Sequence, residues 1–334
     1  MHSNPDINKA PNDRKISSTS SALKPADDKN NKMHTEKLDA LLERLNTIIL
    51  GNPEATKLAV ICLLARGHLL IEDIPGVGKT TLAHALADLF GLPFKRVQFT
   101  SDLLPTDIIG MTIFDMDSRK FHFKKGPIFT STLLADEINR ATPKTQSALL
   151  QAMEEQQVSV EGRQVDLPNP FFVIATQNPL EQSGTFPLPE SQLDRFLMRL
   201  SLGYPNDEFE KRLLRQNGTS NRQSHETVIG AEELGRMIAQ VDEIFVSDAL
   251  IDYLQTLLAK TRSSGVFVNG LSPRAGLQWL QAAKALALIE KRDAVLPEDI
   301  KSLAAYTAAH RLHCNDGSSS AAALKEIIEN TEVL

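Results

Sequence analysis

The segment at residues 69–81, LLIEDIPGVGKTT, constrains the fold of this chain more than any other stretch. Its first three residues are apolar, as in a short parallel strand that is covered on both faces. Gly76 and Gly78 then allow the backbone to turn tightly, and a helical pattern follows from Thr81. Backbone N–H groups converge at such a turn, and the positive end of the helix faces the same point. We therefore predict a binding site for a triphosphate.

The polar residues of this segment fit that prediction. Lys79 is placed to reach the β- and γ-phosphates, and the Thr80 hydroxyl is placed to bind Mg²⁺. The usual pattern, G-x-x-x-x-G-K-[ST], has a glycine where this chain has Asp73, a residue that tolerates a left-handed backbone better than most. Gly-Lys-Thr alone would be compatible with a chance turn, but the flanking strand and helix favour nucleotide binding. The residues expected to hold the nucleotide here are Asp73, Pro75, Gly76, Val77, Gly78, Lys79, Thr80 and Thr81.

The composition indicates a globular protein whose 334 residues have room for about two domains. A hydrophobic fraction of 42% and a charged fraction of 23% are ordinary for such a protein. The formal net charge is −6 and the pI is about 5.8. General binding to nucleic acid requires a basic face that neutralises phosphates, so we expect no nucleic-acid partner.

Two features bear on cellular location. Arg66 and His68 interrupt the best candidate for a membrane span of about 18 apolar residues, and the N-terminus lacks the apolar core of a signal peptide. Cys62 and Cys314 lie far apart without metal-ligand spacing. Because Cys62 falls within an apolar helical pattern, we expect it to be a buried, reduced thiol. These features favour a cytoplasmic protein without membrane insertion.

Three regions follow one another along the chain. Residues 1–34 are rich in Ser, Asn, Asp and Lys and are expected to form a disordered tail. From 35 to 204, apolar runs alternate with helical patterns, which predicts a parallel sheet covered on both faces. Two hairpins are expected within this region, at about 111–125 and 158–165. Residues 205–334 show helical patterns without strong strand runs, so we expect a second, all-α domain.

Individual elements follow from the apolar periodicity. The expected helices lie at residues 36–51, 54–65, 81–90 and 143–156 in the first domain and at 208–215, 231–241, 248–262, 273–291 and 298–311 in the second. The expected strands lie at 69–71, 94–99, 128–135 and 171–176.

Three polar residues at strand ends supply groups that phosphoanhydride hydrolysis requires. Asp136 and Glu137 follow the apolar run TLLA, and Asn178 follows the next buried strand. Ligands of open parallel sheets bind at the carboxyl ends of the strands, next to the phosphate loop. We expect Asp136 to hold Mg²⁺ through water, Glu137 to polarise the attacking water, and Asn178 to orient it. In isolation, each would be an ordinary solvated residue at a strand exit.

Four blocks of the chain, in this order, resemble the MoxR-type ATPases of the AAA+ superfamily: EDIPGVGKT, LLADEINRATPKTQSALLQAMEEQQV, FFVIATQNPLEQSGTFPLPESQLDRFLMRL and LSPRAGLQWLQAAKALALIEKRDAVLPEDIK. The resemblance covers about residues 36–314. It implies an α/β P-loop NTPase core of the AAA+ type with a parallel sheet, followed by an all-α lid domain. It also implies assembly into a ring, usually a hexamer, with ATP and Mg²⁺ bound between neighbouring subunits.

The resemblance assigns roles to individual residues. Lys79 and Thr80 match Walker A, Asp136 and Glu137 match Walker B, and Asn178 matches sensor 1. Arg195 matches the arginine finger, which reaches the neighbour's γ-phosphate. Arg274 matches sensor 2, which contacts the nucleotide of its own subunit. The adenine would lie beside residues 48–52, which include Ile49 and Gly51. In isolation, Arg195 would be a surface partner of Asp194 and Arg274 a solvated helix-start residue. Arg140 and Arg199 are rival candidates for contacts between subunits.

The resemblance further implies chaperone-like remodelling or maturation of a protein client, such as metal or cofactor insertion. A partner with a von Willebrand factor A domain often takes part in such work. Two alternatives stay open at this point. One is a motor subunit of a chelatase-like or DNA-acting machine, and the other is a nucleotide-controlled binding switch with little turnover. The presence of Glu137, Asn178 and Arg195 argues against the switch.

Overall fold

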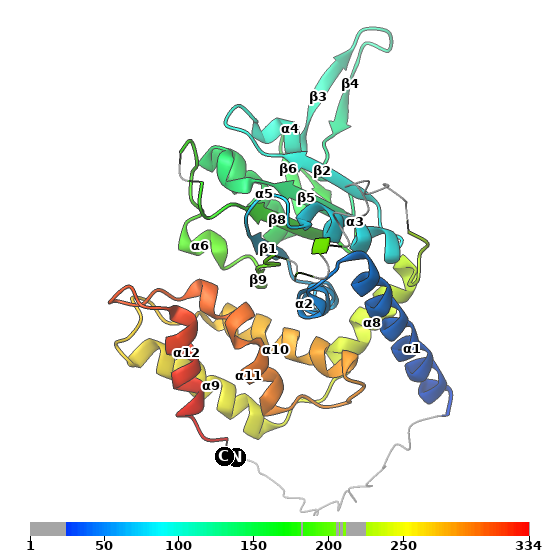
Figure 1. Ribbon diagram of the computed structural model, residues 1–334. Helices are drawn as coiled ribbons and strands as arrows, with labels where there is room; N and C mark the ends of the chain where they lie inside the picture. The colour runs from blue at the N-terminus through cyan, green and yellow to red at the C-terminus, as the bar shows by residue number, and fades with distance from the viewer. Residues whose placement is uncertain (1–24, 182, 205–206, 208–209, 212–224, 334) are drawn as a thin grey trace, which may run out of the picture.

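The computed structural model describes residues 25–181, 183–204, 207, 210–211 and 225–333 (Figure 1). A parallel sheet of five strands lies at the centre of the first domain, in the order β2-β5-β8-β1-β9. The strands are β1 (Leu69–Glu72), β2 (Phe94–Gln98), β5 (Thr132–Asp136), β8 (Phe172–Gln177) and β9 (Met198–Leu200). The predicted parallel sheet is confirmed, with β9 added at one edge.

Side chains alternate along the strands and enter two hydrophobic cores. The helices of this domain are α1 (Pro25–Ile48), α2 (Pro53–Leu64), α3 (Lys79–Leu89), α4 (Pro105–Ile109), α5 (Pro143–Glu155) and α6 (Glu190–Leu193). Leu69 and Ile71 belong to the core that includes residues of α1, α2 and α3. Leu70, which points the opposite way, belongs to the core that includes residues of α4 and α5. Helices therefore cover both faces of the sheet, as such strands require.

The lid is helical and shares its core with one face of the sheet. Its elements are α8 (Ala231–Glu243), α9 (Asp248–Ser263), α10 (Pro273–Ile289), α11 (Pro297–Thr307), the 3-10 turn η2 (Ala309–Arg311) and α12 (Ser320–Glu329). Trp279 of α10 is fully buried, and its indole Nε1 donates to the Ile300 carbonyl at 2.9 Å. The apolar cluster that contains Trp279 extends without a break to Leu69 and Ile71 of β1. The lid is thus packed onto the sheet domain through apolar contact.

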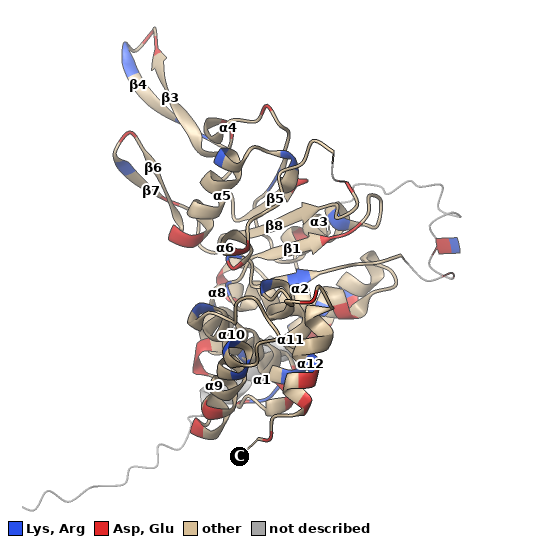
Figure 2. Ribbon diagram, turned by 90° about the vertical axis from the view of Figure 1, so that its left-hand side faces the viewer, with Lys and Arg blue, Asp and Glu red and all other residues tan. Residues whose placement is uncertain are grey.

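Both predicted hairpins are present. One consists of β3 (Gly110–Asp115) and β4 (Lys120–Lys125), and the other of β6 (Gln157–Val160) and β7 (Arg163–Asp166). The β3–β4 hairpin extends from the sheet domain away from the lid, and the ribbon colours mark Lys and Arg residues along it (Figures 1 and 2). The side chains of Phe114, Met116 and Phe121 are exposed on this hairpin.

Several boundaries differ from the expectation. Helix α1 begins at Pro25, inside the segment expected to be a tail, because its first turns are polar and carry no apolar periodicity. Strand β5 begins at Thr132 rather than at residue 128, and the expected helix at 208–215 lies largely outside the described residues. Helix α12 was missed, although Leu324 and Ile328 are buried four residues apart on it.

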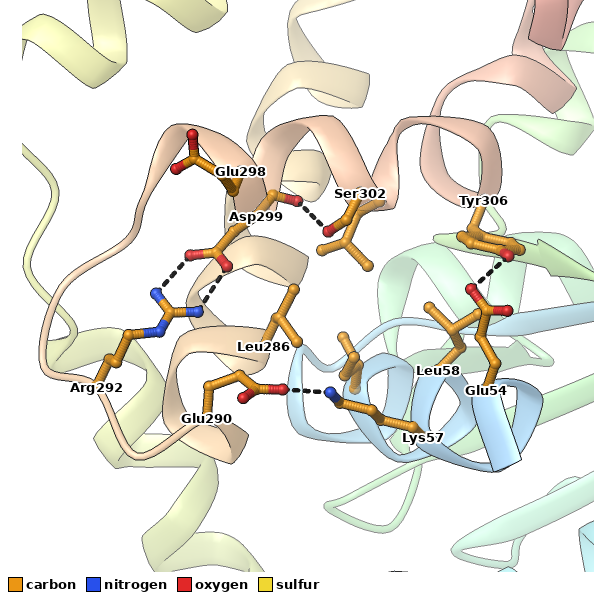
Figure 3. A pocket seen from close by; sticks show the side chains of 12 residues that line it. Glu54, Lys57, Leu58, Leu286, Glu290, Arg292, Glu298, Asp299, Ser302 and Tyr306 are labelled. Carbon is orange, nitrogen blue, oxygen red and sulfur yellow. Dashed lines mark hydrogen bonds and ion pairs between the residues drawn. The ribbon is translucent and has the colours of Figure 1, made fainter. Parts of the chain in front are cut away.

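A cavity of about 360 Å³ lies between α2 and the lid helices α10 and α11 (Figure 3). Ion pairs and hydrogen bonds join its walls, between Lys57 and Glu290 and between Glu54 and Tyr306. Its floor includes the apolar side chain of Leu58. The charged groups that line the cavity thus connect the first domain to the lid.

The two cysteines lie in the interior of the structure. Cys62 and Cys314 are free and buried, which confirms the buried thiol predicted at Cys62. Burial raises the pKa of the Cys62 thiol far above its ordinary value. Among the described residues, no helix combines the length and the apolar character that crossing a bilayer requires.

His68, next to β1, is a buried and uncharged histidine. Its Nδ1 accepts from the Val173 N–H at 3.1 Å, and its Nε2 lies 3.3 Å from the Met153 carbonyl. The pKa of His68 is lowered to about 4, mainly by burial and to a smaller extent by the nearby Arg274 guanidinium, while the contact with the Met153 carbonyl opposes the shift. Because the unfolded chain takes up this proton at a higher pH than the folded chain, folding loses stability as the pH falls.

We expect the free energy of unfolding to fall between about pH 6.5 and pH 4, with His68 contributing up to about 1.4 kcal/mol per pH unit. His68→Gln should make this pH dependence shallower by about one proton. The measurement is urea denaturation followed by circular dichroism across this pH window. An unchanged slope in the variant would show that His68 does not bind the proton in question.

Candidate active site

The predicted site residues lie at the carboxyl ends of three neighbouring strands, β5, β8 and β1. This end of the sheet is called the carboxyl edge below. β8 lies between β5 and β1, and all three strands are parallel. Glu72 at the end of β1 pairs with Gln177 at the end of β8. The phosphate loop, the acidic pair Asp136 and Glu137, and Asn178 therefore leave the sheet at the same edge. This is the edge at which open parallel sheets bind ligands.

The phosphate loop has the backbone conformation that its glycines predict. Gly76 and Gly78 have φ angles of +88° and +96°, in the left-handed region. A Cβ atom added at either glycine would meet no atom within 4 Å, so the loop faces open space. Gly78 is the N-cap of α3, and no side chain caps the first turn of that helix. The N–H groups of the first turn are therefore available to an anion, and this fits a nucleotide phosphate.

Asp73 has a structural role that the sequence does not predict. Among the described residues it is not one of the non-glycine residues with a positive φ. Its buried carboxylate accepts from the Leu202 N–H at 2.6 Å, the Gly203 N–H at 2.8 Å and the Ser201 hydroxyl at 3.0 Å. Asp73 thus fastens the start of the phosphate loop to the segment after β9.

Lys79 occupies the first position of α3 and is half-buried under the loop. Its Nζ donates to the Asp73 carbonyl at 2.6 Å. Burial lowers the pKa of Lys79, while the carboxylates of Asp73, Asp136 and Glu137 raise it. The lysine therefore lies within electrostatic reach of both acidic residues that follow β5. The remaining loop residues expected to bind nucleotide, namely Pro75, Val77, Thr80 and Thr81, lie in the turn or in the first turn of α3.

Asp136 is a buried carboxylate with two sets of partners. Its Oδ1 accepts from the Thr176 hydroxyl at 2.6 Å. Its Oδ2 accepts from the Arg96 guanidinium, through Nη2 at 2.6 Å and Nε at 3.1 Å. A carboxylate held in this way beside the first turn of α3 fits a Mg²⁺ site completed by Thr80, water and phosphate oxygens, because Mg²⁺ takes few protein ligands.

Glu137 has a strained backbone, with φ 56° and ψ 50°. Its N–H donates to the Thr176 hydroxyl at 2.9 Å, and its carboxylate accepts from Gln98 Nε2 at 2.7 Å. Arg140 forms an ion pair with the same carboxylate at 2.9 Å. A left-handed glutamate costs roughly 1–3 kcal/mol and persists where the surrounding structure demands it, typically at functional sites. Here the strain aims the Glu137 side chain along the carboxyl edge of the sheet.

Asn178 and the two rival arginines are engaged within the subunit. The Asn178 Oδ1 accepts from the Leu180 N–H at 3.2 Å. Arg140 pairs with Glu137 and with Glu181, and Arg199 pairs with Glu72 at 3.2 Å. Arg140 therefore belongs to the site of its own chain, where it contacts the predicted water-activating residue.

Arg195 and Arg274 converge on one carboxylate, that of Glu154. Arg195 Nη2 lies 2.8 Å from Glu154 Oε2, and Arg274 Nη1 lies 2.6 Å from Glu154 Oε1. Glu154 follows Met153, whose carbonyl contacts His68 just before β1, and Arg274 acts electrostatically on His68. The phosphate loop follows the other end of β1, about 13 Å away at the usual rise of a strand. The structure therefore places Arg274 with Arg195, and not beside the phosphates of its own subunit as the resemblance implied.

The segment expected beside the adenine and the phosphate loop both form hydrogen bonds with Leu202. Ile49 is buried, and Gly51 has a φ of +95°. Asn52 caps α2 through its Oδ1, and its Nδ2 donates to the Leu202 carbonyl at 3.0 Å. Because Asp73 binds the Leu202 N–H, this segment and the phosphate loop meet at one point.

Three residues of this site were missed by sequence reasoning. Thr176 bonds to both Asp136 and Glu137, while Arg96 and Gln98 bind one acidic residue each. A usable signal was present, since Arg96 and Gln98 are two residues apart and therefore lie on the same face of an expected strand. Thr176, in contrast, ends an apolar run and carries no local signal.

Comparison with known proteins supports this arrangement. Residues 68–198 match a model of the ATPase family associated with various cellular activities (AAA), and residues 259–331 match one of the AAA lid domain. The chain is 42% identical to YeaC of Bacillus subtilis, over 89% of this chain and 94% of that protein. It is 39% identical to the chaperone MoxR1 of Mycobacterium tuberculosis, over 84% of this chain and 76% of that protein.

A crystal structure of a protein from Cytophaga hutchinsonii, described only as a candidate ATPase, superposes with a TM-score of 0.86 at 33% identity. The match covers 92% of this chain and 98% of that one. The core, the lid and the geometry of the phosphate loop agree with these matches. The chain belongs to the MoxR family of AAA+ ATPases.

Proposed function

We propose that this ATPase works as a Mg²⁺-dependent, ring-forming machine whose nucleotide sites are shared between neighbouring subunits. The observation that carries the proposal is the separation of the cationic groups within one chain. Lys79 lies under the phosphate loop, whereas Arg195 and Arg274 lie together on Glu154 at the other end of β1. Arg96 and Arg140, the arginines at the same end of the sheet, form ion pairs with Asp136 and Glu137, so Lys79 would be the cation that this subunit offers to the γ-phosphate.

The residues of the sheet edge support the chemistry of the proposal. The N–H groups of the phosphate loop and Lys79 would hold the phosphates, and Thr80 and Asp136 would hold Mg²⁺. The bound metal would neutralise charge on the phosphate oxygens. Glu137 would accept a proton from the attacking water, and Gln98 and Arg140 hold its carboxylate until then. Asn178 would orient the water after leaving its contact with the Leu180 N–H.

Arg195 and Arg274 would act together on the γ-phosphate of the neighbouring subunit. An arginine offers a permanently charged fork that matches phosphate oxygens. In the isolated chain the Glu154 carboxylate pairs with both guanidinium groups but balances only one of their two positive charges, and a phosphate group brought by a neighbour would compete for them. The proposed sharing makes hydrolysis depend on assembly, for which we propose a hexamer as the resemblance implies.

We further propose that the ring remodels or matures a protein client, with metal or cofactor insertion as one form of this work. The exposed apolar side chains of the β3–β4 hairpin, Phe114, Met116 and Phe121, support a protein client, because such groups favour protein contacts. The relative MoxR1 is described as a chaperone. A partner with a von Willebrand factor A domain and a cytoplasmic location complete the proposal. The two free thiols fit a reducing compartment.

Subunit mixing tests the shared site. Glu137→Gln should still bind ATP and assemble but lose hydrolysis, and Arg195→Ala and Arg274→Ala should each lose about 1,000-fold in rate. When Glu137→Gln is mixed with either arginine variant before ATP is added, about a quarter of the interfaces should contain a complete site. Phosphate release should then rise far above that of either parent. Light scattering should show an ATP-dependent increase in particle size.

A matched control is Arg236→Ala, which removes an exposed lid arginine and should hydrolyse ATP like the wild type. If Glu137→Gln mixed with Arg274→Ala stays inactive while the Arg195→Ala mixture recovers, Arg274 acts within its own subunit. If Arg195→Ala alone keeps full activity at every protein concentration, the shared site is wrong. A monomeric nucleotide switch would then explain the chain better.

Asp73→Ala tests whether Asp73 acts as an anchor of the loop. The variant leaves the Leu202 and Gly203 N–H groups without their acceptor, so we expect a loss of about 1–3 kcal/mol in the free energy of unfolding. Asp73→Asn retains one acceptor oxygen and should lose less. The measurement is urea denaturation without nucleotide. Unchanged stability in both variants would show that the contacts of Asp73 with the segment after β9 do not anchor the loop.

A further inference from the structure

The short segment that carries Arg195 is held by the lid of the same chain. It runs from α6 to β9, and η2 of the lid lies beside it. Figure 1 shows α6 and β9 directly above the lid helices. Arg311 of η2 contacts this segment on both sides of Arg195. Its Nη1 lies 3.0 Å from Asp194 Oδ1, and its Nη2 donates to the Phe196 carbonyl at 2.8 Å.

Neighbouring lid residues reinforce this contact. The Nε2 of the buried His310 lies 3.1 Å from the same Phe196 carbonyl, and Gln278 of α10 accepts from Arg311. The Ser272 hydroxyl lies 3.4 Å from the Asp194 carboxylate, one residue before α10 begins. Two separate parts of the lid, η2 and the residue before α10, therefore contact the residues that flank Arg195, and Gln278 supports Arg311 from behind.

Burial of the charged Arg311 side chain at this contact is unfavourable in free energy. Only 4% of its side chain is exposed, and burial lowers its pKa to about 10 although Asp194 raises it. Burying a charged guanidinium costs several kcal/mol that packing alone would not require, because an apolar side chain of similar size would fill the space. An apolar side chain, however, forms no hydrogen bonds and so cannot orient its neighbours. The Arg311 guanidinium fixes both the Asp194 carboxylate and the Phe196 carbonyl, and so it fixes the orientation of the backbone between them.

We propose that Arg311 is a positioning residue for Arg195, through which the lid of one subunit sets the hydrolysis rate at the nucleotide of its neighbour. This inference rests on the shared site proposed above. Arg311 touches no reacting atom in this arrangement and acts only through the placement of Arg195. A small misplacement of such a group costs about 100-fold in rate.

The test compares Arg311→Met with two variants whose roles in the shared site are proposed above, Glu137→Gln and Arg195→Ala. Arg311→Met has a similar length without the charge, and we expect its phosphate release to fall about 100-fold. Its own nucleotide site is intact, so its affinity for a fluorescent ATP analogue should equal that of the wild type. Mixed with Glu137→Gln before ATP is added, it should recover activity well above either parent. Mixed with Arg195→Ala it should not recover, because both subunits lack a working arginine.

Two further variants separate positioning from folding. Arg292→Met removes another lid arginine, one that forms a bidentate ion pair with Asp299, and it should keep full activity. Asp194→Asn weakens the Arg311 contact from the other side and should show the same mixing behaviour as Arg311→Met, even if Arg311→Met folds poorly.

The outcomes distinguish the two proposals. If Arg195→Ala with Glu137→Gln recovers but neither Arg311→Met nor Asp194→Asn does, Arg311 has no positioning role and the inference is overturned. Full activity of Arg311→Met alone overturns it as well. If even the Arg195→Ala mixture fails to recover, the shared site itself is wrong, and the role of Arg311 is overturned with it.

Discussion

Parallel pairing of β8 with both β5 and β1 is the constraint on which the arrangement of the site depends. This pairing brings the acidic residues after β5, the end of β8 and the phosphate loop after β1 to one edge. The central position of β8 also allows one hydroxyl, that of Thr176, to bind the Asp136 carboxylate and the Glu137 N–H together. The residues proposed to bind the metal and to activate the water, Asp136 and Glu137, are therefore both held by one side chain of the neighbouring strand.

Cationic groups are distributed unevenly around this edge. Lys79, Arg96 and Arg140 are held by the carbonyl and carboxylate groups of their own site. Arg195 and Arg274 share the Glu154 carboxylate near the opposite end of β1. An exposed pair of this kind contributes little to stability, so its value lies in keeping two guanidinium groups close together. This distribution keeps Arg195 and Arg274 away from the phosphate loop of their own chain, and the shared site proposed above is based on that separation.

The sequence predicted the sheet, both hairpins, the lid and the positions of Lys79, Asp136 and Glu137, because each depends on local patterns. Apolar runs identify buried strands, and Gly76 and Gly78 identify the turn. Elements with a weak local pattern and contacts between distant parts of the chain were not predictable in this way. The three-residue β9 is too short to form a pattern, and the polar first turns of α1 resemble a tail. The anchoring role of Asp73 depends on Leu202 and Gly203, and the place of Arg274 depends on how the lid packs.

The apolar core that the lid shares with the sheet limits how the molecule can move. Leu69 and Ile71 of β1 and Trp279 of α10 belong to one continuous cluster. Separating these surfaces would expose buried apolar side chains to water, at a cost of about 25 cal/mol for each Å² of apolar surface exposed. The shared core therefore resists a hinge motion between the sheet domain and the lid. In the ring proposed above, the sheet domain and the lid of one subunit would therefore move as a unit.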